Sequence, residues 1–123
     1  MPEKTKKLKL SNAKMLDMME SLRPLLSHRD KIGYFAARNT RILGDSLTEY
    51  ISIRKQTICK YGTENKGEFT LKIGSPEWEK FCSDMAEFDS IEHEISIYIC
   101  SYADAIGSLT GEEILAADWM LED

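Results

Sequence analysis

Residues 31–61 read KIGYFAARNTRILGDSLTEYISIRKQTICKY, an uninterrupted run without proline. Mostly apolar side chains recur in it every three or four residues, the spacing of one helix face. This stripe consists of Ile32, Phe35, Ala36, Asn39, Ile42, Leu43, Leu47, Tyr50, Ile53, Thr57 and Ile58. Asp30 is placed to cap the start of the run and Gly62 to end it. We therefore predict a single helix over 31–61, about 45 Å long at 1.5 Å per residue.

A helix of this length exceeds what a compact chain of 123 residues needs. It therefore forms either the spine of the fold or a surface for self-association, and in the second case the chain is a homodimer through this helix. Gly44, near its middle, permits a bend or the close approach of another helix.

Outside this run, three short segments alternate apolar and polar side chains, which is the pattern of half-buried strands. They cover residues 6–10, 68–73 and 93–100, and a turn over 63–67 precedes the second. Because short strands with one apolar face are not stable separately, we predict that the three form one small sheet.

Three shorter helices are predicted from capping signals at Ser11, Ser75 and Thr110. A proline directly follows Ser75, where the first turn of a helix tolerates it. Glu113 lies three residues after Thr110 and completes a capping box. The fold class is therefore α+β and helix-dominant, with one long central helix and three shorter helices packed on a small three-stranded sheet.

Length and composition fit a single domain over residues 1–123, with 42% hydrophobic and 30% charged residues. Cys59, Cys82 and Cys100 form no CxxC pair, so they are expected as small buried side chains in a reducing compartment. No histidine has further ligands at metal spacing, and we predict no metal and no cofactor. The sequence shows neither a signal peptide nor a membrane span, which predicts a cytoplasmic protein.

The charge is distributed unevenly along the chain. Residues 1–75 carry a net charge of +7, whereas residues 76–123 carry −12 and only one cation, Lys80. Either the two halves complement each other within the fold, or the acidic half offers a surface to a basic partner. The carboxylates can also be an ordinary solvated face.

The residues predicted to contact a partner fall into two groups. Arg38, Asn39 and Arg41 lie within one turn of the long helix, with Asn39 on its apolar stripe. They form a polar recognition point, or Asn39 is buried and fixes the register of packing. The second group comprises acidic-half carboxylates and a tryptophan that suits an interface hot spot or covers the sheet. Its members are Glu87, Asp89, Glu92, Glu94, Glu112, Glu113, Asp118 and Trp119.

A cluster of methionines has two interpretations. Thioethers pack well in cores, and they also line adaptable binding grooves. The core is the expected place for them here, with a groove as the alternative. The residues are Met15, Met18, Met19 and Met85.

Five segments, taken in order, resemble a family of small proteins of unknown function from tailed-phage and prophage genomes. The segments are KLKLSNA (7–13), KIGYFAARN (31–39), KYG (60–62), EISIY (94–98) and LTGEEILAADWM (109–120). Their order and spacing carry the resemblance. The proline usual just before the Lys-x-x-Tyr segment lies earlier here, at Pro24. The resemblance implies a phage setting, and hence a bacterial host cell, but no chemistry.

No phosphate-binding loop, GxSxG elbow or HExxH motif is present in the sequence, and we predict a non-enzymatic protein that binds another protein stoichiometrically. One hypothesis is a phage accessory protein that inhibits a host defence complex, its acidic half occupying a nucleic-acid-binding groove. Another is a component or chaperone of phage tail or virion assembly. The third is a small nucleic-acid-binding protein that uses the basic half.

Overall fold

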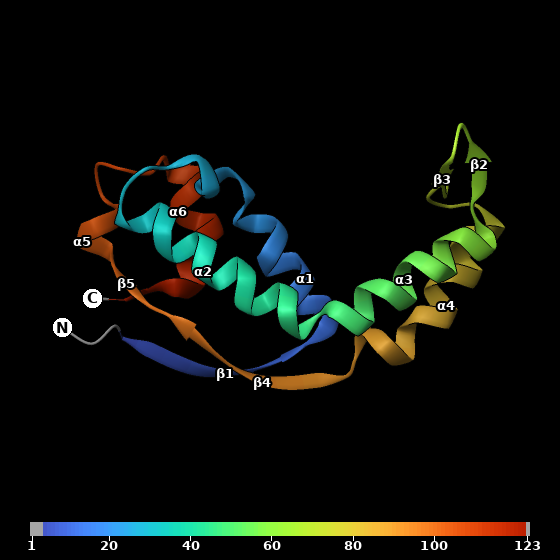
Figure 1. Ribbon diagram of the computed structural model, residues 1–123, viewed down its shortest axis with the longest axis horizontal. Helices are drawn as coiled ribbons and strands as arrows, with labels where there is room; N and C mark the ends of the chain where they lie inside the picture. Colours follow the sequence, from blue (N-terminus) through green and yellow to red (C-terminus); the bar gives the residue numbers. More distant parts are fainter. Residues whose placement is uncertain (1–3, 123) are drawn as a thin grey trace.

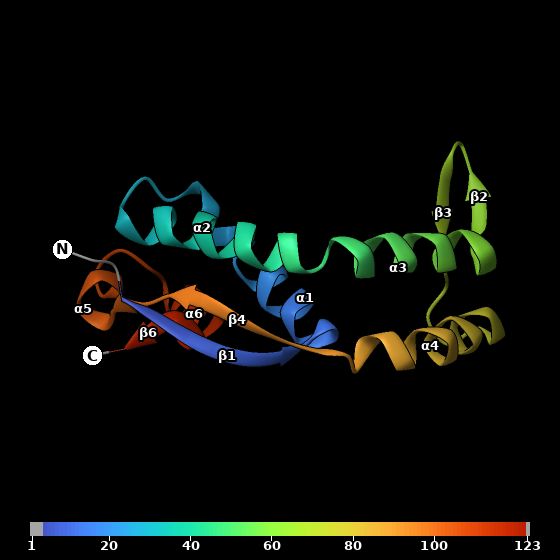
Figure 2. The same ribbon diagram turned by 60° about the horizontal axis from the view of Figure 1, so that its bottom comes forward.

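The computed structural model describes residues 4–122 as an elongated molecule with two parts, here called the head and the arm (Figures 1 and 2). The arm contains α3 (Thr48–Tyr61), β2 (Thr63–Asn65), β3 (Glu68–Thr70) and α4 (Pro76–Asp89). The head contains β1 (Thr5–Ser11), α1 (Asn12–Ser21), η1 (Arg23–Ser27), α2 (Lys31–Ser46), β4 (Glu92–Tyr98), β5 (Cys100–Ser101), α5 (Tyr102–Ala105), α6 (Gly111–Ala117), η2 (Asp118–Met120) and β6 (Leu121–Glu122). The prediction that helix dominates the fold is confirmed, because 61% of the described residues are helical.

The arm is an insertion into the head. The chain leaves the head after α2, runs out along α3, turns back through the β2–β3 hairpin and returns along α4 to β4 (Figure 1). The two arm helices pack side by side, and β4 then pairs with β1. Segments before and after the arm therefore close the head together.

The prediction of one helix over 31–61 is wrong at Leu47, where α2 and α3 meet at a bend. Leu47 has φ −99° and ψ 3°, outside the helical region. The Thr48 hydroxyl donates to the main-chain oxygens of Gly44 and Asp45, at 3.3 and 3.1 Å, a local bond that often bends helices. Because the Leu47 side chain is completely buried, packing in the head fixes the position of the bend.

The predicted three-stranded sheet is not what the chain forms, since the described residues contain three separate two-stranded sheets. β1 and β4, which correspond to the first and third segments, pair antiparallel, and β5 pairs with β6 in parallel. The second segment was predicted as a half-buried strand, but only Glu68–Thr70 form one, β3, and all three residues are exposed. This strand pairs with β2, its neighbour in sequence. Lys66 (φ 54°) and Gly67 (φ 83°) form the two-residue turn with positive φ that favours such a hairpin. Pairing across this turn closes a far shorter loop than pairing with β1 or β4.

The predicted helix caps are confirmed. Hydroxyl or carboxylate oxygens of Ser11, Asp30, Ser75 and Thr110 each accept a main-chain N–H three residues later. The capping box is complete, because Glu113 accepts in return from the Thr110 N–H at 2.9 Å. These local signals set the start of each main helix except α3.

The core lies in the head and extends into the base of the arm. Met15 and Met18 on α1 are buried, as is Met85 on α4, while Met19 is partly buried. Three of the four methionines therefore pack in the core as expected. Cys100 is buried too, and burial raises the pKa of its thiol to about 11. The expectation of burial is wrong for Cys59 and Cys82, which are exposed on the arm.

Candidate functional site: the two faces of the arm

The basic and acidic halves of the sequence meet within the fold. Every ion pair that a lysine makes between residues 4 and 122 joins the first half to the second. The pairs are Lys4–Glu122 (2.9 Å), Lys6–Glu122 (3.3 Å), Lys7–Glu94 (3.8 Å), Lys9–Glu92 (3.9 Å), Lys31–Asp104 (3.4 Å) and Lys60–Asp84 (3.8 Å). Two predicted partner contacts, Glu92 and Glu94, are thus matched by β1 lysines. Exposed pairs stabilise little, but they reduce the charge that this part of the acidic half presents.

Two further carboxylates from the predicted group are held near the C-terminus. Glu113 Oε2 lies 2.8 Å from His28 Nε2, in addition to the bond from the Thr110 N–H. The Thr110 N–H first, and His28 second, lower the pKa of Glu113. Asp118 accepts a short hydrogen bond from the Tyr102 hydroxyl. These groups connect η1, α5 and α6 to their neighbours.

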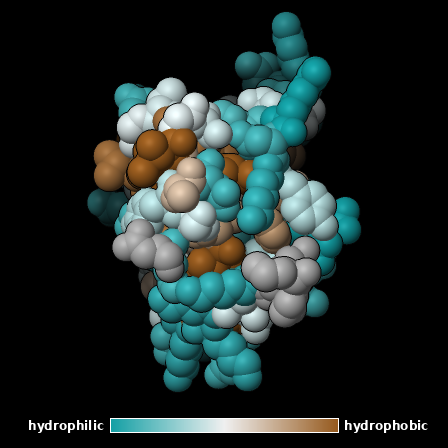
Figure 3. Space-filling view, turned by 90° about the vertical axis from the view of Figure 1, so that its left-hand side faces the viewer, coloured by the Kyte–Doolittle hydropathy of each residue, from teal (hydrophilic) through white to brown (hydrophobic). Residues whose placement is uncertain are grey.

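The end of the head opposite the arm shows no large surface of one kind. In Figure 3 its hydrophobic patches are small and hydrophilic side chains separate them. Trp119 is half-buried against the core, and its Nε1 is buried without a hydrogen-bond partner in the described part of the chain. Glu112 is exposed and has no cation within 4.0 Å among residues 4–122.

The three helix residues predicted as a recognition point lie in different environments. Asn39 is completely buried: its Nδ2 donates to the Tyr98 carbonyl at 3.0 Å, and its Oδ1 accepts from the Tyr98 N–H at 2.8 Å. Arg38 donates to the hydroxyls of Tyr34 and Tyr98, and the Tyr98 bond is the main reason why the pKa of Arg38 is raised. Arg41 is exposed. The structure does not bring this group together with the predicted carboxylates of α4.

The arm separates charge between its two helices. α3 carries two more cations than acids, whereas α4 carries four more acids than cations. On α4 the carboxylates of Glu77, Glu79 and Glu87 are exposed, and none of them has a cation within 4.0 Å in residues 4–122. α4 therefore carries three unpaired carboxylates of the acidic half. We call Glu77, Glu79 and Glu87, together with Asp84, which pairs with Lys60, the acidic face.

Asp89, another predicted contact, belongs to the base of the arm. It accepts a short hydrogen bond from the Tyr50 hydroxyl. Burial first, and Asp89 second, raise the pKa of Tyr50 to about 12. Nearby, the Arg54 guanidinium lies 5.3 Å from the centre of the Phe81 ring, which stacks on Trp78. These contacts hold α3 and α4 to each other.

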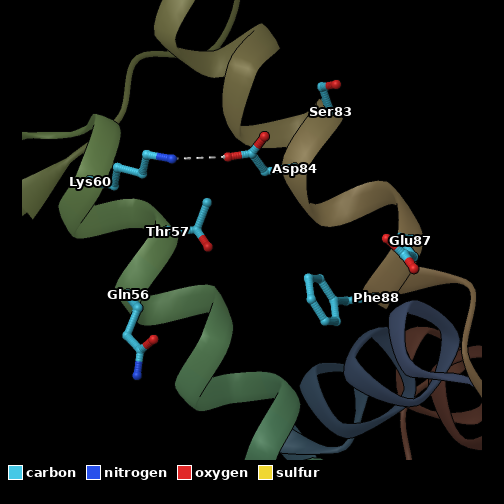
Figure 4. Close-up of a pocket in the computed structure, with 7 residues that line it drawn as sticks. All are labelled: Gln56, Thr57, Lys60, Ser83, Asp84, Glu87 and Phe88. Carbon is cyan, nitrogen blue, oxygen red and sulfur yellow. Dashed lines mark ion pairs between the residues drawn. The ribbon is translucent and has the colours of Figure 1, made fainter.

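An open hollow of about 500 Å³ lies between residues 56–60 of α3 and residues 83–88 of α4 (Figure 4). Lys60 reaches across it to Asp84, and Asp84 also accepts from the Tyr61 hydroxyl at 2.6 Å. Glu87 lines the same hollow beside Phe88. The hollow thus exposes carboxylates of the acidic face over a partly apolar base.

A second hollow lies on another side of α3, against α1, and was not predicted. This α1–α3 groove has a volume of about 640 Å³. Its apolar residues are Leu16, Met19, Ile51 and Ile58, and its charged residues are Asp17, Glu20, Arg23, Arg54 and Lys55. Ile51 and Ile58 lie two helical turns apart, which was a signal in the sequence. This spacing could not be interpreted as a groove, because no local pattern in the sequence indicates where α1 packs.

The described residues 4–122 contain no group of three or more histidine, cysteine, aspartate or glutamate side chains that could hold a metal ion. None of the helices in that range is both long and apolar enough to cross a membrane. Comparison of the chain with protein-family models, with curated proteins and with solved structures found no match, so the phage resemblance stays a prediction.

Proposed function

We propose that this protein acts by stoichiometric binding to another protein, and that the acidic face of α4 contacts a basic surface of that partner. The unpaired carboxylates of Glu77, Glu79 and Glu87 carry the proposal. Most other carboxylates of the acidic half are matched by lysines, His28 or tyrosine hydroxyls within the fold. The arm holds α4 away from the head, so a partner can approach it without meeting β1 (Figure 1).

The resemblance to phage proteins supports two versions of this proposal. In the first, a host defence protein presents a basic groove that normally binds nucleic acid, and the acidic face occupies it as an inhibitor. In the second, the partner is a phage tail or head protein during assembly. The charge of α4 favours the first version, because a helix with four more acids than cations suits a groove that normally binds the negative charge of phosphates.

The test is affinity capture from infected host cells with the full chain as bait, followed by identification of the bound protein. We expect one predominant partner with a strongly basic surface. Neutralising the acidic face with Glu77→Gln, Glu79→Gln and Glu87→Gln together lowers its recovery severalfold, because the charge attraction is lost. Glu112→Gln, an exposed carboxylate on α6, is the matched control and leaves recovery unchanged.

Two outcomes would separate the versions or reject both. Recovery of tail or head proteins alone selects the assembly role. Equal recovery of the partner by the neutralised chain and by the control rejects the acidic face as the contact. Binding that does not weaken as salt concentration rises contradicts the electrostatic basis in the same way.

Nucleic-acid binding by the basic half is the second candidate. Lys4, Lys6, Lys7 and Lys9 are matched by carboxylates. Arg41, Arg54 and Lys55 have no carboxylate within 4.0 Å in the described residues, and they carry this alternative. An electrophoretic mobility shift at physiological salt tests it, and no retardation of single- or double-stranded DNA or RNA rejects it.

A further inference from the structure

The β2–β3 hairpin at the end of the arm is a small sheet that contacts α3 and is otherwise largely exposed. Each strand has three residues, and every one of these residues is exposed. The turn at Lys66–Gly67 preorganises the hairpin. A two-stranded hairpin is at best marginally stable in water unless further strands or a packed face support it. The hairpin therefore has the geometry of a half-completed sheet.

Both strands of this hairpin have an unpaired edge, and the edge of β3 is the one nearer the head (Figure 1). Asn65 and Glu68 flank the two-residue turn and form a hydrogen-bonded pair, so pairing alternates from there along the strands. The N–H and C=O of Phe69 consequently point away from β2, and no hydrogen bond from them to another element occurs within residues 4–122. In Figures 1 and 2 β3 is the strand nearer the head, so this edge faces the concave side of the molecule.

Apolar side chains accompany the free edge. Phe69 is 39% exposed and Ile73, just beyond the strand, is 76% exposed. The concave side below them contains the α1–α3 groove, with its apolar floor and unmatched Arg54 and Lys55. Residues 63–73 carry two acids and two lysines, and the groove carries Asp17 and Glu20 beside its three cations, so each side presents both charges. One chain thus carries a free strand edge, exposed apolar side chains beside it and an apolar groove that can receive such side chains.

We propose that two copies of this chain associate through their hairpins, with β3 of one copy pairing antiparallel to β3 of the other. The free edges join into a four-stranded sheet in the order β2–β3–β3–β2 across a two-fold axis. Each hairpin enters the concave side of the other copy, above its α1–α3 groove. Phe69 faces Phe69 at the axis, and Glu68 faces Thr70, so no like charges lie opposite each other within the paired strands.

A single substitution separates edge pairing from other forms of association. Proline lacks the N–H that the free edge uses, but it is tolerated on edge strands where that N–H does not bond the existing neighbour. Sedimentation velocity over a concentration series up to about 100 μM, which detects micromolar association, is expected to show a dimer for the unmodified chain. Phe69→Pro halves the observed mass, whereas Phe69→Thr, which keeps the N–H and a strand-forming side chain, remains dimeric.

Covalent trapping tests the register directly. In a chain with Cys59→Ser and Cys82→Ser, Phe69→Cys places two thiols opposite each other at the axis, within the Cα separation that a disulfide needs. Mild oxidation is expected to give a covalent dimer rapidly. Glu64→Cys, also at an exposed position but on β2 and away from the axis, is the control for random collision and stays largely monomeric.

Three results would overturn the proposal. They are a monomer for the unmodified chain at every concentration, a Phe69→Pro variant as dimeric as Phe69→Thr, and equal cross-linking at positions 64 and 69. A dimer that survives Phe69→Pro but dissociates with Ile51→Lys would assign self-association to the long α2–α3 segment instead. Circular dichroism of each variant excludes loss of the fold as the cause.

Discussion

At the scale of single residues, Asn39 takes the place of a neighbouring strand for part of β4. Its side-chain amide pairs with both the N–H and the C=O of Tyr98, and it does so in a fully buried position. We expect Asn39→Leu to leave those groups unpaired and to lower the free energy of unfolding by about 2 to 4 kcal/mol. Urea denaturation of the full chain measures it. Arg41→Ala, an exposed change one half-turn away, should alter stability by less than about 0.5 kcal/mol, and equal losses in the two variants would contradict this role.

Glu113 predicts a dependence of stability on pH. Folding lowers its pKa below the ordinary 4.5, so its ionised form is stabilised in the folded state. That contribution is present above the unfolded pKa and is lost as pH falls through the lower, folded value. Glu113→Gln keeps a capping-box side chain but cannot ionise. The difference in unfolding free energy between the unmodified chain and this variant should be largest above pH 4.5 and shrink towards lower pH. A difference that stays constant down to about pH 3 would show that the carboxylate charge contributes nothing.

At the scale of elements, the sequence predicted the features that depend only on neighbouring residues, above all the starts of helices. Caps at Asp30, Ser75 and Thr110 act within three residues, so sequence was enough to place these helix starts. The alternating pattern of 68–73 identified a strand in its first half only, over Glu68–Thr70, and it did not identify the neighbour, because a period of two does not specify which strand pairs with it. The bend at Leu47 likewise depends on burial in the head.

The candidate site shows the same limit. The acidic composition of residues 76–123 was visible in the sequence, including Glu87 on α4. Which carboxylates remain unpaired depends on β1 lying antiparallel to β4, so that Lys7 meets Glu94. No local pattern contains that pairing, and the α1–α3 groove depends on tertiary packing in the same way.

At the same scale, replacing the two glycines of α2 by alanine should change the stability of the fold in opposite directions. A Cβ at Gly44 would lie 3.8 Å from Met19 Sδ, an ordinary contact, so Gly44→Ala should stabilise the helix by about 0.5 to 1 kcal/mol. A Cβ at Gly33 would lie 2.0 Å from the main-chain oxygen of His28, so Gly33→Ala should destabilise the fold. Thermal unfolding of both variants measures the contrast. A fall in melting temperature for Gly44→Ala would show that the close approach of α1 requires glycine there.

At the scale of the whole molecule, the head and the inserted arm are expected to differ in local stability. Segments from before and after the arm close the head, since β1 and β4 pair along seven residues. Asn39 also bonds to Tyr98 and thereby joins α2 to this β1–β4 sheet. The arm is held by the contacts of α3 with α4 and by the aromatic base around Phe81. Its outer end has only the exposed hairpin. Regions with few buried apolar contacts open at a lower free energy than the global unfolding.

Hydrogen exchange measured by mass spectrometry should therefore show an order along the chain. Main-chain amides over 93–99 and within α2 exchange last, because they open only when the head unfolds, and amides over 63–74 exchange first. If hairpins pair between copies, protection over 63–74 rises with protein concentration while protection over 93–99 does not, since only the first depends on association. Uniform exchange along the chain would mean that arm and head unfold as one unit. Protection of the hairpin that is high and independent of concentration would mean that the hairpin is stable without a second copy.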